Sequence, residues 1–284
     1  MTRGLLTLLF AVVTTMNPSA QTVDRTKAPE TGPLPAFKLP PVFETTLPNG
    51  LQVVLIEDRR FPLVTVRLGF QAGGKFDPAD RPGLAEAVGS LLTEGTATRT
   101  SRQIAEQLAE IGGALSANAG PDTFVVSGNA LAENTSILLD LLADVSIRAS
   151  FPEDELQIFK SRRLQELLAE RSDAAFWADD KIAASVFGSH PYARTNPTPE
   201  SIEKVNREVL AGFRDKMLAP NNAVLLLLGA LPPRAQTLDL IKARFGEWAR
   251  REVPAPPAPE FPKSERSILM VDRPGSVQAD IRIG

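Results

Sequence analysis

The chain has 284 residues, of which 43% are hydrophobic and 23% charged, a composition typical of a globular protein with one large domain or slightly more. Its formal net charge is −3, from 31 basic and 34 acidic residues without a basic run, which argues against nucleic acid as a partner. There are no cysteines, so disulfides, thiolate zinc sites and cysteine nucleophiles are excluded.

The N-terminal stretch predicts export. Arg3 precedes the almost wholly apolar stretch 5–13, and small and polar residues follow. This order is typical of a secretory signal peptide over residues 1–20, which implies a periplasmic or secreted protein. Pro18 is poor chemistry for signal cleavage, so a retained membrane anchor stays an alternative. A Pro-rich linker is expected over residues 21–42.

Beyond this linker, the apolar pattern predicts strands alternating with helices. Pro48-Asn49-Gly50 separates two short β-type runs, and Asn-Gly favours the positive φ angles of a tight hairpin turn. Expected strands cover residues 43–47, 51–57, 63–71, 114–119, 123–131 and 222–229, the last as a continuous apolar run buried on both faces. Expected helices cover residues 82–96, 101–111, a segment capped by Asn134, then 153–170, 176–187, 201–217 and 237–249. This order predicts an α+β fold, with a mostly antiparallel sheet packed against helices.

A second Pro-rich linker marks a domain boundary. We expect a first domain over residues 43–253 and the linker over residues 254–266. Residues 267–284 then form the truncated start of a further domain, with strands at Ser267 to Asp272 and Gln278 to Ile283. So short a segment cannot bury a core of its own.

The expected helix over residues 82–96 carries the candidate site. It begins at Pro82-Gly83, and its apolar residues recur at helical spacing. Glu86, Gly89 and Ser90 are spaced i, i+3 and i+4, so they share one face of the helix. This is the spacing with which a two-histidine motif aims both imidazoles at one zinc ion.

The segments around this helix resemble the metal helix of the pitrilysin/insulinase family of zinc peptidases, whose inverted motif is H-x-x-E-H. Gly83-Leu84-Ala85 precedes the three positions, and Leu91-Leu92-x-x-Gly95-Thr96 follows them. Further similarities to the shorter, bacterial processing-peptidase-like branch occur in order at Leu47 to Leu51, Gly112 to Ala117, Pro220 to Ala223 and Asp272 to Gln278. The resemblance implies two homologous peptidase-like halves around a chamber, of which residues 43–253 would be the first.

In that family, two motif histidines and a distant glutamate hold zinc, and the motif glutamate is the general base. Here the motif positions hold Glu86, Gly89 and Ser90, and Glu166 in the long helix matches the distant glutamate. The whole chain has one histidine, His190, so no two-histidine motif exists in any register. The resemblance therefore implies a catalytically degenerate member that has lost the zinc ligands and the base of its relatives.

Other chemistry at these positions is less favoured. Glu86, Ser90 and Glu166 offer only oxygen donors, which would prefer calcium or magnesium over zinc, and we favour a salt-bridged or solvated helix face instead. His190 is either a ligand or acid/base residue or, as we favour, a turn histidine hydrogen-bonded by its neighbours. A Ser90 nucleophile with His190 as base lacks both a strand-turn-helix elbow and an orienting acid.

Family members also hold peptides by adding them to an exposed strand edge beside the metal helix, a mode that needs only main-chain hydrogen bonds. The resemblance assigns this edge to the strand formed by Leu115, Ser116, Ala117, Asn118 and Ala119. The alternative is that this strand is simply paired within the sheet.

The resemblance leads to one favoured function and two alternatives. The favoured function is a non-catalytic, supporting and peptide-holding subunit of an exported zinc endopeptidase heterodimer, with no metal of its own. Its partners would be a catalytically active paralogue and peptides or unfolded protein segments. The first alternative is a stand-alone periplasmic peptide-binding or scaffold protein. The second is an active metalloendopeptidase with a non-standard metal site.

Overall fold

The computed structural model describes residue 32, residues 40–258 and residues 266–284. The expected signal peptide over residues 1–20 lies outside the described residues, as does most of the first linker. Within the described part, no helix is long and apolar enough to cross a membrane.

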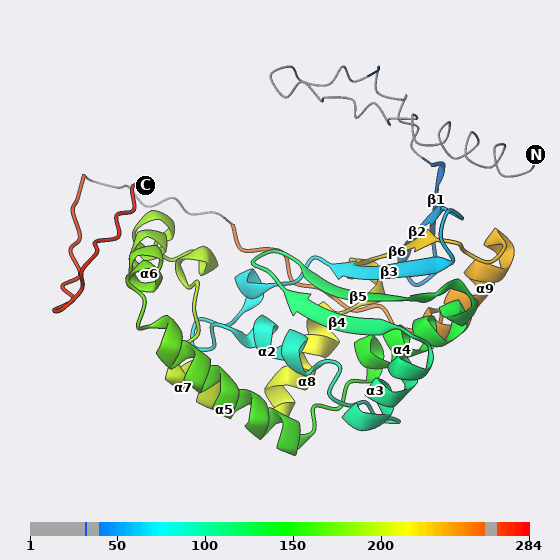
Figure 1. Ribbon diagram of the computed structural model, residues 1–284, viewed down its shortest axis with the longest axis horizontal. Helices are drawn as coiled ribbons and strands as arrows, with labels where there is room; N and C mark the ends of the chain where they lie inside the picture. The colour runs from blue at the N-terminus through cyan, green and yellow to red at the C-terminus, as the bar shows by residue number, and fades with distance from the viewer. Residues whose placement is uncertain (1–31, 33–39, 259–265) are drawn as a thin grey trace, which may run out of the picture. The chain divides into compact units, whose positions relative to one another are not determined.

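A six-stranded sheet organises the fold, with strand order β1-β2-β6-β3-β5-β4 (Figure 1). The strands are β1 Val42–Thr46, β2 Gln52–Glu57, β3 Leu63–Phe70, β4 Ala114–Ala119, β5 Phe124–Leu131 and β6 Ala223–Gly229. All neighbours pair antiparallel except β2 and β6, which are parallel. The expected α+β fold with a mostly antiparallel sheet is therefore confirmed.

The hairpin between β1 and β2 turns where Asn49-Gly50 predicts it. Gly50 has a φ of 91°, which a residue with a side chain rarely adopts. The Asn49 side-chain amide donates to the carbonyl oxygens of Phe245 (2.6 Å) and Trp248 (3.1 Å), so it also ties the hairpin to the end of the last helix.

Helices cover one face of the sheet (Figure 1). They are α2 Leu84–Leu91, α3 Ser101–Glu110, α4 Thr135–Arg148, α5 Glu153–Glu170, α6 Ala174–Phe187, α7 Pro199–Glu203, α8 Arg207–Met217 and α9 Arg234–Phe245. The core lies between this layer and alternate strand residues, as on β3, where Val64, Val66 and Leu68 are fully buried.

The expectation that the last strand is buried on both faces is wrong. On β6, Leu225 and Leu227 are fully buried, whereas Val224 is 39% exposed and Leu228 is 37% exposed. The leucine-rich strand is apolar on both faces, but the helices pack against only one face.

Two helix predictions also need correction. The expected helix over residues 201–217 is two helices, because Asn206 begins α8 by accepting a hydrogen bond from the Val209 amide (2.9 Å). Asn134 does not cap α4 with its side chain, which instead donates to the Ile111 carbonyl oxygen (3.2 Å).

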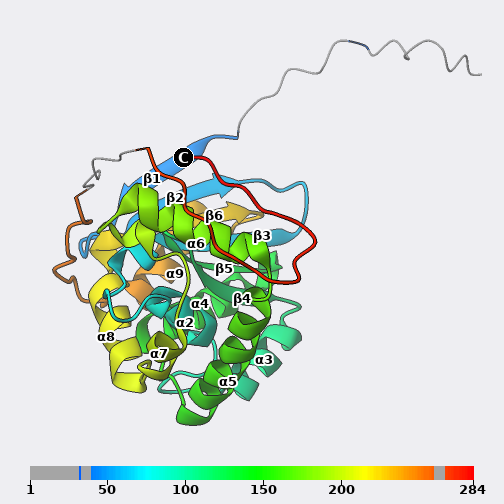
Figure 2. The ribbon, with the colours of Figure 1, turned by 90° about the vertical axis from the view of Figure 1, so that its left-hand side faces the viewer.

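The C-terminal segment contains neither of the two expected strands. Within residues 266–284 the backbone has no strand partner, and Ile268 and Ile283 are 88% and 93% exposed. Arg273 donates to the Ser172 carbonyl oxygen and Arg282 pairs with Asp179, so the segment runs beside α6 (Figure 2). An extended apolar segment forms a β-strand only when its backbone hydrogen-bonds to a neighbouring strand, and no described strand pairs with residues 266–284. The division at residues 254–266 stays a prediction.

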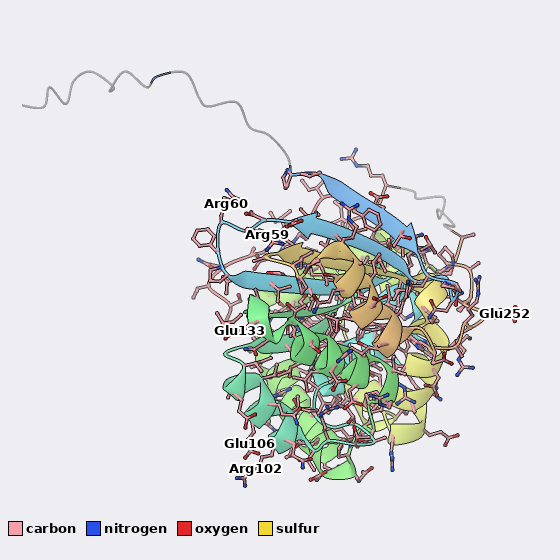
Figure 3. The ribbon with its side chains drawn as sticks, turned by 90° about the vertical axis from the view of Figure 1, so that its right-hand side faces the viewer. Arg59, Arg60, Arg102, Glu106, Glu133 and Glu252 are labelled. Carbon is pink, nitrogen blue, oxygen red and sulfur yellow. The ribbon has the colours of Figure 1, made fainter. Side chains whose placement is uncertain are left out.

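Many ion pairs of this chain lie at the surface. Arg102 and Glu106 on α3 pair at 2.7 Å with both side chains more than half exposed, and Figure 3 shows them pointing outward. Such pairs contribute about 0–1 kcal/mol to stability.

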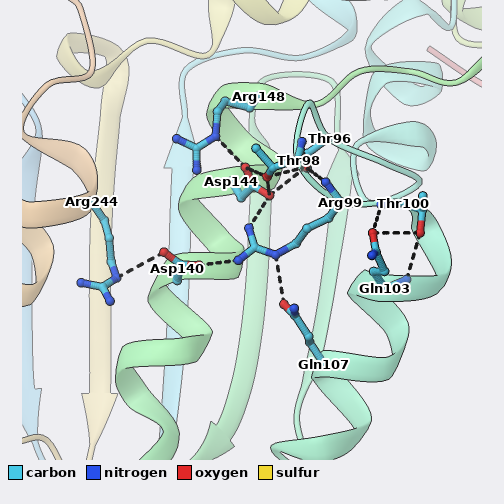
Figure 4. A network of polar contacts seen from close by, with 10 residues as sticks. All are labelled: Thr96, Thr98, Arg99, Thr100, Gln103, Gln107, Asp140, Asp144, Arg148 and Arg244. Atoms are coloured by element: carbon cyan, nitrogen blue, oxygen red, sulfur yellow. Dashed lines mark hydrogen bonds and ion pairs between the residues drawn. The ribbon is translucent and has the colours of Figure 1, made fainter.

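One polar network is instead buried, and it fastens the loop between α2 and α3 to α4 (Figure 4). The fully buried carboxylate of Asp144 accepts hydrogen bonds from Thr96 Oγ1 (2.8 Å), Arg99 Nη1 (2.6 Å) and Arg148 Nε (2.6 Å). The Thr98 hydroxyl donates to the same carboxylate (3.1 Å). The network therefore fixes the position at which the chain leaves α2.

Candidate functional site

The α2 helix places Glu86, Gly89 and Ser90 as their spacing predicts. Its apolar side is buried in the core, and Gly89 lies against the backbone of β4. A Cβ atom at Gly89 would be 3.4 Å from both the Ala117 carbonyl oxygen and the Ala119 amide nitrogen. The α2 helix therefore lies directly on the strand expected to bind peptide, with room at Gly89 for no more than a methyl group in van der Waals contact.

A buried carboxylate holds the beginning of α2. Asp77 accepts hydrogen bonds from the backbone amides of Gly83 (2.8 Å) and Ala85 (2.9 Å), which are among the free amides of the first turn. Burial raises the pKa of Asp77 from 3.8 to about 6, against the lowering effect of these hydrogen bonds.

The raised pKa of Asp77 makes stability depend on pH. The folded chain binds this proton more tightly than the unfolded chain, so the contribution of Asp77 to stability rises as pH falls through about 6. Relative to Asp77→Asn, the wild-type chain should gain on the order of 1 kcal/mol in unfolding free energy between pH 7 and pH 5. Urea unfolding of both proteins at the two pH values measures this gain. A constant difference would contradict the assignment.

A buried guanidinium lies among the carboxylates of the site. Arg163 on α5 is 7% exposed, and its Nε forms an ion pair with Glu86 Oε1 on α2 at 3.1 Å. Its Nη1 and Nη2 donate to the two carboxylate oxygens of Glu170 at 3.1 and 3.2 Å. Arg163 therefore joins α2 to α5 by charge.

Glu166 lies on the same helix, as the sequence predicts, but does not contact Arg163. Its half-exposed carboxylate is 3.6 Å from Arg162 Nε. Partial burial raises the pKa of Glu86, the charge of Arg163 opposes this, and the charges of Glu170 and Glu166 add to it. Two carboxylates, those of Glu86 and Glu170, thus pair with the Arg163 guanidinium.

These residues do not fit zinc. Zinc sites use imidazole, thiolate or carboxylate donors with free lone pairs, whereas Glu86 is already paired with a cation, and Gly89 has no side chain to act as a base. Among the described residues, no group of three or more His, Cys, Asp or Glu could hold a metal ion. The ion pair matches the salt-bridged helix face that the sequence favours, and it argues against the non-standard metal site. Arg163 itself was not foreseen, although it precedes Glu166 by one helical turn.

His190 is a turn histidine bonded by its neighbours, as favoured from the sequence. Its Nδ1 accepts from the Tyr192 amide (3.3 Å), and its ring packs on those of Tyr192 and Phe187. The Tyr192 hydroxyl in turn donates to Asp122. The structure shows no hydrogen bond between His190 and Ser90, both of which it describes, so it lends no support to a nucleophile and base pair.

The strand expected to hold peptide lies at the edge of the sheet. β4 pairs with β5 on one side, and no described strand pairs with its other side. Leu115, Ala117 and Ala119 are half-buried on the helix side, and Ser116 and Asn118 are exposed. The strand is thus paired within the sheet on one side, and its use as a peptide-holding edge stays a prediction.

Comparison with known proteins agrees with this arrangement. The sequence matches the family described as "Insulinase (Peptidase family M16)" over residues 52–199, and the "Peptidase M16 inactive domain" over residues 204–284.

Among similar proteins, an uncharacterized zinc protease of Mycobacterium leprae is 27% identical over 76% of this chain and 49% of its own length. A probable mitochondrial-processing peptidase subunit beta of Arabidopsis thaliana is 26% identical over 71% of this chain and 38% of its own. The chain thus spans about half the length, or less, of these relatives.

Solved structures show the same fold. A protease from Helicobacter pylori has a TM-score of 0.71 at 20% identity, over 79% of this chain and 55% of that one. A peptidase M16 inactive domain from Pseudomonas fluorescens has a TM-score of 0.69 at 25% identity, over 78% and 55%. The chain therefore belongs to the insulinase family of peptidases, family M16.

Proposed function

We propose that this chain is the non-catalytic, peptide-holding subunit of an exported zinc endopeptidase, paired with a relative that carries H-x-x-E-H. One observation carries the proposal: a buried guanidinium, that of Arg163, is paired with Glu86 at the position where the family's motif places a zinc ligand. The protein retains the framework of the helix and the sheet but offers neither an imidazole nor a base at the motif.

The open edge of β4 supports the peptide-holding part of this function. An extended peptide added to a sheet edge is bound by main-chain hydrogen bonds, which do not depend on a metal. Gly89 of α2 lies against the same strand, so a peptide on this edge would lie beside the degenerate motif. The name of the Arabidopsis relative contains the word subunit, and a solved relative, a ferredoxin protease, is in complex with Arabidopsis ferredoxin. These names support protein substrates and subunit partners for this chain. The proposal that the protein is exported depends on the signal-peptide-like sequence of residues 1–20.

The test is peptide cleavage by the purified chain, by a co-encoded relative with H-x-x-E-H, and by their mixture. We expect cleavage to rise at least about tenfold in the mixture over either protein alone, since the second subunit completes the binding surface. Cleavage by this chain alone, or a mixture no more active than the relative, would refute the proposal.

The peptide edge is tested with proline at Ala117 and, separately, at Asn118. Successive backbone amides of a strand point to opposite sides, so one of the two points away from β5. Proline at that position should weaken peptide binding about tenfold with little loss of stability, because it removes a donor only from the free edge. Fluorescence anisotropy with a labelled extended peptide measures the affinity. Unchanged affinity in both variants would exclude this edge.

A stand-alone peptide-binding protein is the second candidate function, since no strand of the described residues pairs with the outer edge of β4. Peptide affinity of the chain alone, with no effect of added relative on cleavage, would favour it over the heterodimer.

A further inference from the structure

The turn from β4 to β5 lies against the backbone of the segment that leads into α2. The amides of Gly74 and Lys75 donate to the carbonyl oxygens of Gly120 and Pro121, in the turn, at 3.0 Å each. A Cβ atom at Gly73 would be 2.7 Å from the Pro121 carbonyl oxygen, so the two backbones approach as closely as only glycine allows. The turn is therefore seated by main-chain contacts on this side.

A second segment reaches the same turn with a side chain. Tyr192 lies in the short 3-10 helix η3, Pro191–Ala193, and its hydroxyl donates to Oδ1 of Asp122 in the turn. Lys75 Nζ donates to the same oxygen at 3.0 Å. These hydrogen bonds from Tyr192 and Lys75 hold the pKa of Asp122 below its usual range, so the acceptor is charged at neutral pH. A hydroxyl that donates to a charged carboxylate forms one of the stronger classes of hydrogen bond.

The end of α6 holds the Tyr192 ring in place. The ring packs edge-on against Phe187, with centroids 5.5 Å apart, and against His190, with centroids 4.6 Å apart. The Nδ1 atom of His190 also accepts a hydrogen bond from the Tyr192 amide. Both the backbone and the ring of Tyr192 are thus fixed, and a side chain that is already ordered loses little further freedom when it forms a hydrogen bond.

The chain that continues from η3 is fastened to the beginning of α2. Ser201, in the first turn of α7, donates to the Pro82 carbonyl oxygen at 2.9 Å. Pro197 lies so close to Gly83 that a Cβ atom at Gly83 would be 2.9 Å from the Cβ atom of Pro197. Residues 192–201 therefore tie the turn at the end of β4 to the first residues of α2.

These contacts meet at the part of β4 that lies on α2. Gly89 of α2 lies against Ala117 and Ala119, and Ala119 is the last residue of β4 before the turn. A peptide added to a strand edge needs successive main-chain donors and acceptors in register, so a displacement of the turn would misplace those of these last residues. The position of the turn is therefore a condition for peptide binding at this end of the strand.

We propose that Tyr192 is a positioning residue for the peptide-holding edge. Through its hydrogen bond to Asp122 it keeps the turn, and with it the last residues of β4, in the conformation that an added peptide strand requires. The His190 turn then acts by presenting Tyr192 and has no catalytic part of its own. This role rests on the proposed function, because it concerns the edge at which the peptide is held.

The first measurement is amide hydrogen exchange of the chain without peptide, resolved by NMR. Tyr192→Phe removes only the hydroxyl. The amides of Gly74, Lys75 and Gly120, which seat and close the turn, should then exchange about fivefold faster, as expected for the loss of one hydrogen bond. The amide of Leu225, in the fully buried centre of the sheet, should exchange at the wild-type rate.

Variants of Asp122 separate the hydrogen bond from the charge. Asp122→Asn keeps an oxygen that accepts from the Tyr192 hydroxyl, so exchange at the turn should stay within about twofold of the wild type. Asp122→Ala should be at least as fast as Tyr192→Phe, and adding Tyr192→Phe to it should have no further effect, because both remove the same bond. Asp179→Ala is the matched control. Asp179 is 58% exposed against 52% for Asp122, but it pairs with Arg282, so exchange at the turn should not change.

The second measurement is peptide affinity by fluorescence anisotropy, with a fluorescein-labelled peptide of alternating valine and serine residues as the probe. Tyr192→Phe should weaken binding about fivefold and Asp122→Asn less than about twofold, because the latter keeps the turn in place. Thermal unfolding should show the same midpoint for these variants and the wild type.

The outcomes separate this role from the proposed function. A wild-type chain that does not bind the peptide refutes the proposed function, and the positioning role with it. A wild-type chain that binds peptide, with an affinity or a turn exchange rate that Tyr192→Phe leaves unchanged, overturns the positioning role alone. So does an Asp122→Asn variant as impaired as Tyr192→Phe, since charge rather than the tyrosine hydrogen bond would then hold the turn.

Discussion

Replacing Asp144 by alanine is expected to lower the free energy of unfolding by about 3–4 kcal/mol at pH 7. The carboxylate is fully buried and accepts hydrogen bonds from Arg99, Arg148 and Thr96. Alanine would leave Arg99 without its buried partner and would remove the carboxylate to which the Thr96 hydroxyl donates, and both losses are costly in the interior. Urea unfolding followed by circular dichroism measures the change.

The effect of Asp144 should depend on pH with a definite sign. Burial raises the pKa of Asp144, but the hydrogen bonds from Arg99, Thr96 and Arg148 together lower it by more. The net pKa therefore lies below the ordinary 3.8. A pKa lowered by folding contributes stability above the unfolded value and loses it as pH falls through the folded value. The difference between wild type and Asp144→Ala should therefore shrink below about pH 4.

Glu106→Ala is the control for this prediction, since it removes an exposed ion pair with Arg102 (Figure 3). It should change the free energy of unfolding by less than about 0.5 kcal/mol. Equal losses from Asp144→Ala and Glu106→Ala would contradict the role of the buried network.

Replacing Arg163 by methionine should lower the free energy of unfolding by about 2 kcal/mol at pH 7. Methionine keeps most of the buried volume but leaves Glu86 and Glu170 without their cation. Both carboxylates are nearly half exposed and can regain water, so the loss should be smaller than for Asp144.

Acid should partly rescue the Arg163→Met variant. Burial already raises the pKa of Glu86 and Arg163 opposes this, so the variant should have a still higher Glu86 pKa. A carboxyl whose pKa is raised by folding loses stability as pH rises through that pKa, so the defect should be larger at pH 7 than at pH 4. Arg162→Met, at a side chain 61% exposed, is the matched control and should cost less than about 0.5 kcal/mol. A defect independent of pH would mean that Arg163 acts by packing alone.

Much of the fold follows from local patterns. Strict alternation on β3 predicts one buried face, and Asn49-Gly50 predicts the hairpin before β2. The continuous apolar run of β6 is compatible with burial on one or both faces, and only the layer arrangement decides between them. That arrangement is a property of the whole chain, so the exposure of Leu228 could not be predicted from its own segment.

The charged residues that organise the site could not be predicted in the same way. Asp144 lies in an otherwise apolar helix stretch, and its partners Thr96 and Arg99 come from a loop far earlier in the chain. The pairing of Arg163 with Glu86 likewise joins helices distant in sequence. The sequence pattern of one helix identifies the motif positions, but it does not show which side chain of another helix pairs with the Glu86 carboxylate.

The zinc content of the purified chain tests the central claim, that a guanidinium is the cation of the degenerate motif. The chain is dialysed against zinc at pH 7, passed through a desalting column and measured by inductively coupled plasma mass spectrometry, beside a relative with H-x-x-E-H. Because Arg163 already pairs with Glu86, and Gly89 and Ser90 offer no zinc ligand, we predict far less than one zinc per chain, against one in the relative. One tightly bound zinc per chain, lost on replacing Glu86 or Glu166, would contradict the account.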